Sequence, residues 1–138
     1  MTADESRGSL LVVDDEAELV RALCEALAEE GFRAVGAGTP GEALALRRGG
    51  FDVLLTDLMM PGSDGVELLR AAREVDRDVV AVVMTGLATD RSAEEAARAG
   101  ALGYVPKPFR LREVLPVLER AVEAHRERVR GGPPETPG

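Results

Sequence analysis

Asp57 is the residue of this sequence whose placement most clearly predicts chemistry. It follows residues 53–56, a run with the mostly apolar composition of a buried strand. Aspartate is depleted in strands, and an unpaired carboxylate is costly to bury. Open α/β folds bind their ligands at the carboxyl ends of parallel strands. A carboxylate at such a strand end therefore predicts a functional site.

Four further polar residues follow other apolar runs in the same way: Asp14, Asp15, Thr85 and Lys107. Each alone has an ordinary structural explanation, as a helix cap, a strand-end hydroxyl or a surface charge. Three carboxylates in one pocket repel one another, so together they predict a bound cation. Oxygen ligands without His or Cys favour Mg2+ or Mn2+. A cation, a hydroxyl and an ammonium would neutralise a phosphoryl group on Asp57 without attacking it.

The elements that must position these residues alternate between strands and helices. Five apolar or β-branched runs recur at residues 10–13, 33–35, 53–56, 79–84 and 103–105, each followed by helical signals. Continuous apolarity in the first, third and fourth runs is typical of a parallel sheet covered on both faces. The pattern predicts an α/β fold, namely a (βα)5 doubly wound, five-stranded parallel sheet with the flavodoxin-like order 2-1-3-4-5.

Several local signals refine the expected helices. Gly31 is a natural end for the first helix, and Thr39 an N-cap for the second, which should end near Gly50. The fourth helix, at residues 90–99, has an alanine-rich apolar face and should be the most loosely anchored. Pro116 predicts a kink or a 3₁₀ first turn in the fifth helix.

Length and charge set the broad class of the protein. The 138 residues suit one domain, expected at residues 9–128, with a disordered N-terminus at 1–8 and a disordered tail or truncated linker at 129–138. A net charge of -8 opposes direct binding of nucleic acid. No apolar stretch approaches the roughly 20 residues that span a bilayer, so a cytoplasmic protein without membrane contact is expected. The single histidine, His125, excludes a multi-His metal site within this sequence.

Four segments together resemble the receiver domain of bacterial two-component response regulators. They are residues 12–16 (VVDDE), 54–65 (LLTDLMMPGSDG), 83–86 (VMTG) and 103–109 (GYVPKPF). The resemblance extends from about residue 10 to residue 122. It implies that Asp57 is a phosphoacceptor, which takes its phosphoryl group from a phosphohistidine on a sensor histidine kinase or a phosphotransfer protein.

The resemblance also implies roles for the surrounding residues. Asp15 would bind Mg2+ directly and Asp14 mostly through water, and the backbone carbonyl of Met59 would supply a further ligand beside Asp57. Thr85 and Lys107 would each bond a phosphoryl oxygen, and the Lys107–Pro108 peptide bond is expected to be cis.

Tyr104 stands where the family places its switch aromatic. On this interpretation Thr85 moves toward the phosphoryl group and Tyr104 rotates into the space it leaves. The face made by the fourth helix, the fifth strand and the fifth helix then becomes the readout surface. Tyr104 could also be an ordinary half-buried strand aromatic. Met59 and Leu87 are apolar where some relatives orient the hydrolytic water, so slow self-dephosphorylation is expected.

The leading hypothesis is therefore a phosphorylation-controlled switch that assists its own phosphotransfer and is not an enzyme acting on free substrates. Its output would pass by protein contact to a downstream target or a fused output domain, and a phosphorylation-linked homodimer is a further candidate. One alternative is a receiver fold that binds partners without phosphate. Another is an aspartyl-phosphate phosphohydrolase. Met59 argues against this alternative, because it occupies the position at which such an enzyme needs a second acid.

Overall fold

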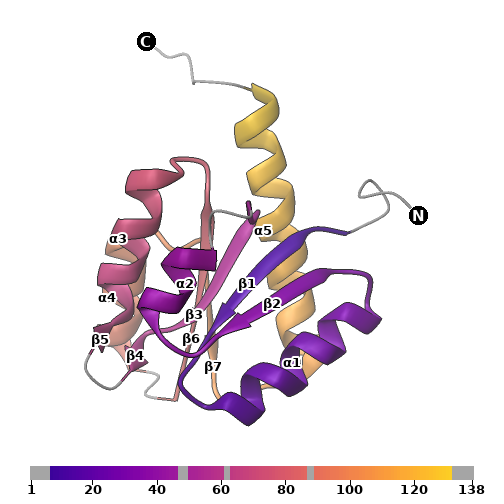
Figure 1. Cartoon of the computed structure of the whole chain (residues 1–138). Coiled ribbons are helices and arrows are strands. Elements are labelled where there is room, and N and C mark those ends of the chain that lie inside the picture. The colour runs from indigo at the N-terminus through magenta and orange to yellow at the C-terminus, as the bar shows by residue number, and fades with distance from the viewer. Residues whose placement is uncertain (1–6, 47–49, 61–62, 87–88, 132–138) are drawn as a thin grey trace.

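The computed structural model describes residues 7–46, 50–60, 63–86 and 89–131. Strands and helices alternate along the chain as β1 (Ser9–Val13), α1 (Ala17–Glu29), β2 (Arg33–Ala37), α2 (Pro40–Leu46), β3 (Val53–Asp57), β4 (Met59–Met60), β5 (Ser63–Asp64), α3 (Gly65–Val75), β6 (Val80–Thr85), α4 (Asp90–Arg98), β7 (Gly103–Pro106) and α5 (Leu111–Gly131). Figure 1 shows the longer strands side by side, with helices on both sides of the sheet.

The central sheet has five parallel strands in the order β2-β1-β3-β6-β7. These are the first to fifth of the long strands, so the predicted 2-1-3-4-5 order is confirmed. Sequence analysis did not predict the short antiparallel pair of β4 and β5, in which Met59 lies opposite Asp64. A strand of two residues is too short to leave a recognisable alternation of apolar and polar side chains.

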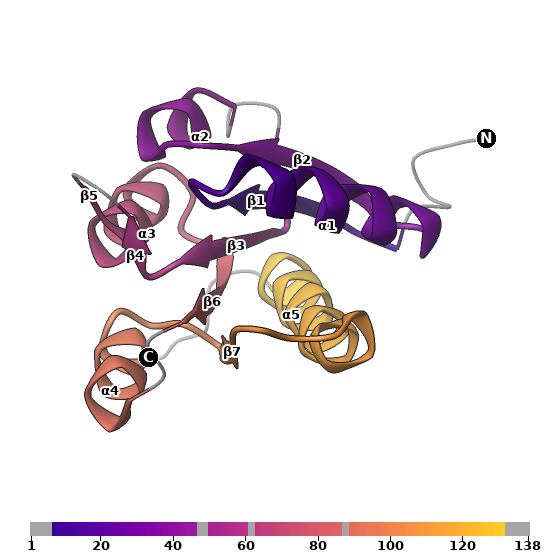
Figure 2. The ribbon, with the colours of Figure 1, turned by 90° about the horizontal axis from the view of Figure 1, so that it is seen from below.

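The sheet separates two hydrophobic cores. Figure 2 shows α1 and α5 beside one face and α2, α3 and α4 beside the other. Successive strand residues point to opposite faces, so Leu55 of β3 belongs to the α1/α5 core and Leu54 to the α2/α3/α4 core. Both faces are covered, which is why β3 and β6 are buried at every position.

The helix α4 has little large apolar area against the sheet. Its buried residues are Ser92 and Ala96, whereas α5 buries Val114, Leu118, Ala121 and Val122. Burial of apolar area contributes roughly 25 cal/mol per Å2, so small side chains anchor a helix less strongly than leucine and valine do. The structure thus has the small α4 contact that the alanine-rich sequence predicts.

The structure describes a few residues on either side of the predicted domain, residues 9–128. At the amino end, the Arg7 N–H donates to the Gly31 carbonyl at 2.9 Å, and the Arg7 guanidinium lies 4.7 Å from the centre of the Phe32 ring. At the other end α5 continues to Gly131, three residues past the predicted limit. The rest of the two predicted disordered segments, residues 1–6 and 132–138, lies outside the described structure.

Pro116 does not interrupt α5. The helix is α-helical from Leu111. The Arg110 carbonyl accepts a hydrogen bond of the 3₁₀ type from the Glu113 N–H at 2.8 Å and one of the α-helical type from the Val114 N–H at 3.3 Å. The Glu113 carboxylate in turn accepts from the Arg110 N–H at 2.7 Å. This capped first turn fixes the direction of the helix before the proline is reached.

Capping of α2 follows the prediction at Thr39, whose hydroxyl accepts from the Glu42 N–H at 3.1 Å. The Glu42 carboxylate accepts from Gly38 at 2.7 Å. The described part of α2 ends at Leu46, and residues 47–49, which lead to the predicted end near Gly50, lie outside the described structure. Within the described ranges, no helix is long and apolar enough to cross a membrane.

Candidate functional site

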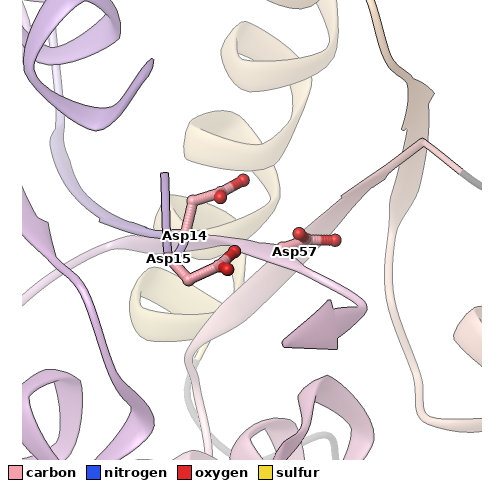
Figure 3. Close-up of side chains that lie close together, drawn as sticks. All are labelled: Asp14, Asp15 and Asp57. Atoms are coloured by element: carbon pink, nitrogen blue, oxygen red, sulfur yellow. The ribbon is translucent and has the colours of Figure 1, made fainter. Parts of the chain in front are cut away.

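The carboxyl edge of the sheet brings the predicted site residues together. Asp14 directly follows β1, Asp57 and Thr85 end β3 and β6, and Lys107 directly follows β7. Because these strands are parallel, their ends meet at one edge. Figure 3 shows the side chains of Asp14, Asp15 and Asp57 close together at this edge. One carboxylate oxygen of each lies within 4.8 Å of the others.

The three carboxylates differ in exposure and in partners. Asp14 is fully buried, and Asp57 is 6% exposed, whereas Asp15 is exposed. The Asp14 carboxylate accepts from the Glu16 backbone N–H at 2.9 Å and from Lys107 at 2.6 Å. Asp14 is therefore held in place from two sides, while Asp15 faces solvent at the rim.

Lys107 is the positive centre of the site. Its ammonium nitrogen, Nζ, lies 2.6 Å from Asp14, 3.2 Å from Asp57 and 3.3 Å from Glu16. Its backbone N–H donates to the Thr85 carbonyl at 2.7 Å, and the Lys107–Pro108 peptide bond is cis. Burial lowers the pKa of the ammonium, but hydrogen bonds and charge interactions with Asp14 and Asp57 outweigh burial and raise the pKa to about 12.

The donor set suits a hard divalent cation. Three carboxylates with one ammonium leave excess negative charge, which a cation bound by oxygen ligands would neutralise. Asp15, Asp57 and Lys107 line a pocket of about 800 Å3, whose lining also includes Leu19, Pro108 and Phe109. The Met59 backbone lies in β4, two residues beyond Asp57. The pocket thus has carboxylates that could bind a cation and room for a small anionic group.

Thr85 and Tyr104 lie on neighbouring strands but have different surroundings. Thr85 is 1% exposed and lines the pocket. Tyr104 is half-buried, and its hydroxyl lies 2.7 Å from the Ser92 hydroxyl of α4. Ser92 and Thr89 form a reciprocal capping box at the start of α4. A direct contact therefore joins Tyr104 to the first turn of α4.

Two residues of this region, Glu16 and Ser92, were not predicted from the sequence. Glu16 follows the Asp pair and is the N-cap of α1, but its side chain does not cap that helix and contacts Lys107 instead. Thr89 is a residue type that commonly caps a helix, but no sequence signal indicates the contact of Ser92 with Tyr104. Leu87, to which a part in dephosphorylation was assigned, lies outside the described residues.

Comparisons with known proteins agree with this geometry. The model of the response regulator receiver domain matches residues 10–119. The DNA-binding transcriptional regulator NtrC of Azospirillum brasilense is 35% identical over 124 residues, which cover 87% of this chain and 25% of that protein. A response regulator receiver protein of Anaeromyxobacter is 39% identical over 106 residues, covering 76% of this chain and 44% of that protein.

A solved structure has the same fold. The CheY-like response regulator receiver domain protein of Methanospirillum hungatei superposes with a TM-score of 0.80 at 27% identity, covering 87% of this chain and 97% of that one. This chain spans less than half the length of the two curated relatives above. The sheet order, the acidic strand ends and the match over residues 10–119 together show that the chain belongs to the response regulator receiver domain family.

Proposed function

We propose that Asp57 accepts a phosphoryl group from a phosphohistidine and that the resulting aspartyl phosphate switches the surface of the domain. In this transfer the P–N bond to the histidine breaks, a P–O bond to an Asp57 carboxylate oxygen forms, and the imidazole leaves as the neutral base after taking a proton. The observation that carries the proposal is that the carboxylates of Asp14 and Asp57 both lie within 3.2 Å of the ammonium nitrogen of Lys107.

Asp14, Asp15, Asp57 and the Met59 carbonyl would hold Mg2+ or Mn2+, which would neutralise charge on the transferring group. The protein side chains do the remaining work. Lys107 donates hydrogen bonds in a pocket that burial makes less polar than water, and Thr85 offers a hydroxyl from the next strand. Asp14 orients Lys107 through their 2.6 Å ion pair.

The contact between Tyr104 and Ser92 supports readout through α4, β7 and α5. Movement of Thr85 toward a phosphoryl group would free space beside β7, and rotation of Tyr104 into it would break the 2.7 Å contact with Ser92. Since α4 buries little apolar area, loss of one contact at its first turn can change its position. The output is then a protein contact and not turnover of a free substrate.

Partners follow from the same reasoning. The phosphoryl donor is a sensor histidine kinase or a phosphotransfer protein. The NtrC relative is named as a DNA-binding transcriptional regulator and is about four times as long as the matched region. Its length supports a fused output domain or a separate protein target, and a phosphorylation-linked homodimer would use the same readout face.

Metal removal tests the phosphoacceptor proposal. Wild-type protein incubated with acetyl phosphate and Mg2+ is expected to gain one phosphoryl group, observed by mass spectrometry of the intact protein. EDTA in place of Mg2+ is expected to abolish the gain, because Asp14, Asp15 and Asp57 then repel the anionic donor. Full labelling in EDTA would contradict a role for the carboxylate cluster in binding a metal.

Tyr104 provides a test of the readout face. Beryllofluoride with Mg2+, a stable mimic of the phosphoryl group, is expected to shift the amide resonances of Thr89, Ser92 and Tyr104, with Leu27 of α1 as the unchanged reference. The variant Tyr104→Phe lacks the hydroxyl and should show altered Ser92 resonances before any addition. Its free energy of unfolding should fall by about 0.5–1.5 kcal/mol, the contribution of one hydrogen bond. If the amide resonances of Thr89, Ser92 and Tyr104 in wild type did not change on adding beryllofluoride and Mg2+, the proposed readout face would be wrong.

A further inference from the structure

The third carboxylate on Lys107 belongs to Glu16, a residue with no role in the function proposed above. An ammonium group has three N–H donors, and three carboxylates lie within 3.3 Å of Lys107 Nζ. All three donors therefore have partners before any phosphoryl group arrives. A phosphoryl oxygen that bonds Lys107 must displace one of them.

The three partners are not equally easy to displace. The Asp14 side chain is fully buried and its contact is the shortest, so its release would leave a buried charge without a partner. Asp57 is the attachment point of the phosphoryl group and remains beside it. The Glu16 side chain is 64% exposed, so water can replace Lys107 as its partner at little cost. Glu16 is therefore the carboxylate that a phosphoryl oxygen would displace from Lys107.

The backbone of α1 explains how Glu16 reaches this position. The Glu16 carbonyl accepts the first helical hydrogen bond from the Val20 N–H at 3.1 Å, and the Glu16 N–H donates to the Asp14 carboxylate at 2.9 Å. These two bonds fix the main chain of the N-cap residue. The side chain makes no capping bond to α1 and extends across the rim to Lys107. Serine or aspartate at this N-cap would bond its own helix instead.

We infer that Glu16 is a positioning residue for Lys107. Its carboxylate accepts from the third N–H donor of Lys107, which a phosphoryl oxygen would also use, and it therefore competes with that oxygen. The inference rests on the phosphoacceptor function proposed for Asp57. It concerns how tightly phosphoryl groups bind: Glu16 weakens their binding both by occupying Lys107 and by adding negative charge at the rim. Burial lowers the pKa of Lys107, and the carboxylates that raise it again are Asp14 and Asp57, which fits a weak, exchangeable Glu16 contact.

The test compares Glu16→Gln with Glu18→Gln. Both variants lose one exposed negative charge from α1, and Glu18 makes no ion pair in the part of the chain that the structure describes. At saturating Mg2+, Glu16→Gln is expected to bind beryllofluoride about two- to fivefold more tightly than wild type, as expected for release of an exposed ion pair. Glu18→Gln should stay close to wild type. Binding is followed by NMR titration.

A double-mutant cycle assigns the gain to the Lys107 contact. In a Lys107→Met background, Glu16→Gln is expected to bring no gain in beryllofluoride affinity, because the ammonium for which Glu16 and the phosphoryl oxygen compete is absent. Mg2+ affinity, titrated alone, should change equally in Glu16→Gln and Glu18→Gln. Equal beryllofluoride affinity in those two variants would overturn the inference, as would a selective loss of Mg2+ affinity in Glu16→Gln. Wild-type protein that bound no beryllofluoride would instead remove the phosphoacceptor proposal and this inference together.

Discussion

Asp57→Asn is expected to take up no phosphoryl group from acetyl phosphate and Mg2+ under conditions that label the wild-type protein fully. The amide of asparagine has nearly the shape of the carboxylate but is not a nucleophile, so the loss should be on the order of 100-fold or more. Lys107 also loses one of its carboxylate partners, at 3.2 Å. Intact-protein mass after a fixed time measures the effect.

Asp52→Asn is the matched control for this experiment. Asp52 lies just before the amino end of the same strand, far along β3 from the site, where its carboxylate accepts from the Ser9 N–H at 3.1 Å and lies 3.4 Å from His125. The control makes the same chemical change at the opposite end of β3 and should label like wild type. If Asp57→Asn and wild type labelled equally, Asp57 would not be the acceptor.

Lys107→Met should lower the free energy of unfolding by about 3–5 kcal/mol in metal-free buffer. The substitution leaves the fully buried Asp14 carboxylate without its ammonium partner, beside the nearly buried Asp57. Urea unfolding followed by far-UV circular dichroism measures the change. Mg2+ should reduce the deficit, because a cation that binds the folded state restores positive charge and stabilises it by mass action.

The double variant Lys107→Met, Asp14→Asn separates lost charge pairing from lost packing. Neutralising Asp14 removes the buried charge, so the double variant should be more stable than Lys107→Met alone. A double variant as unstable as Lys107→Met would assign the loss to the lysine methylenes and not to the ion pair.

The stability difference between wild type and Lys107→Met should depend on pH. The pKa of Lys107 rises from 10.5 to about 12 on folding, because the carboxylates outweigh burial. The folded protein thus holds this proton more tightly than the unfolded chain does. Its stabilising contribution is fully present below pH 10.5 and is lost as pH rises through about 12. The stability gap between wild type and Lys107→Met should be constant from neutral pH up to about 10.5 and should narrow as the pH rises further, through about 12.

The fold could be predicted because its signals are local and repeated. Strands such as β3 begin with a run of apolar residues and are buried at every position, and helix ends have recognisable caps such as Thr39 and Gly31. The positions of Asp14, Asp57, Thr85 and Lys107 followed from the same pattern, since parallel strands end at one edge. Their chemical roles rested on the resemblance to receiver domains and remain proposals.

What escaped prediction depends on side-chain direction across the folded molecule. Glu16 is adjacent to the acidic pair in sequence, but whether its side chain caps α1 or reaches Lys107 is decided by a residue 91 positions away. The contact of Tyr104 with Ser92 likewise joins two elements through side-chain rotamers. Arg7 was assigned to a disordered end because one residue leaves no periodicity, although it binds Gly31 and covers Phe32.

The sheet that separates the two cores also divides the protein into two compartments for evolutionary change. Leu54 and Leu55 are neighbours in sequence but pack into different cores. Substitutions more than about 7–10 Å apart that share no partners have nearly additive effects on stability. Where residues of the two cores are that far apart, the α2/α3/α4 side, which includes the α4 part of the proposed readout face, can vary while the α1/α5 core keeps its packing. If the proposed readout is correct, substitutions on the α4 side would alter partner recognition while the packing of α1 and α5 against the sheet stays the same.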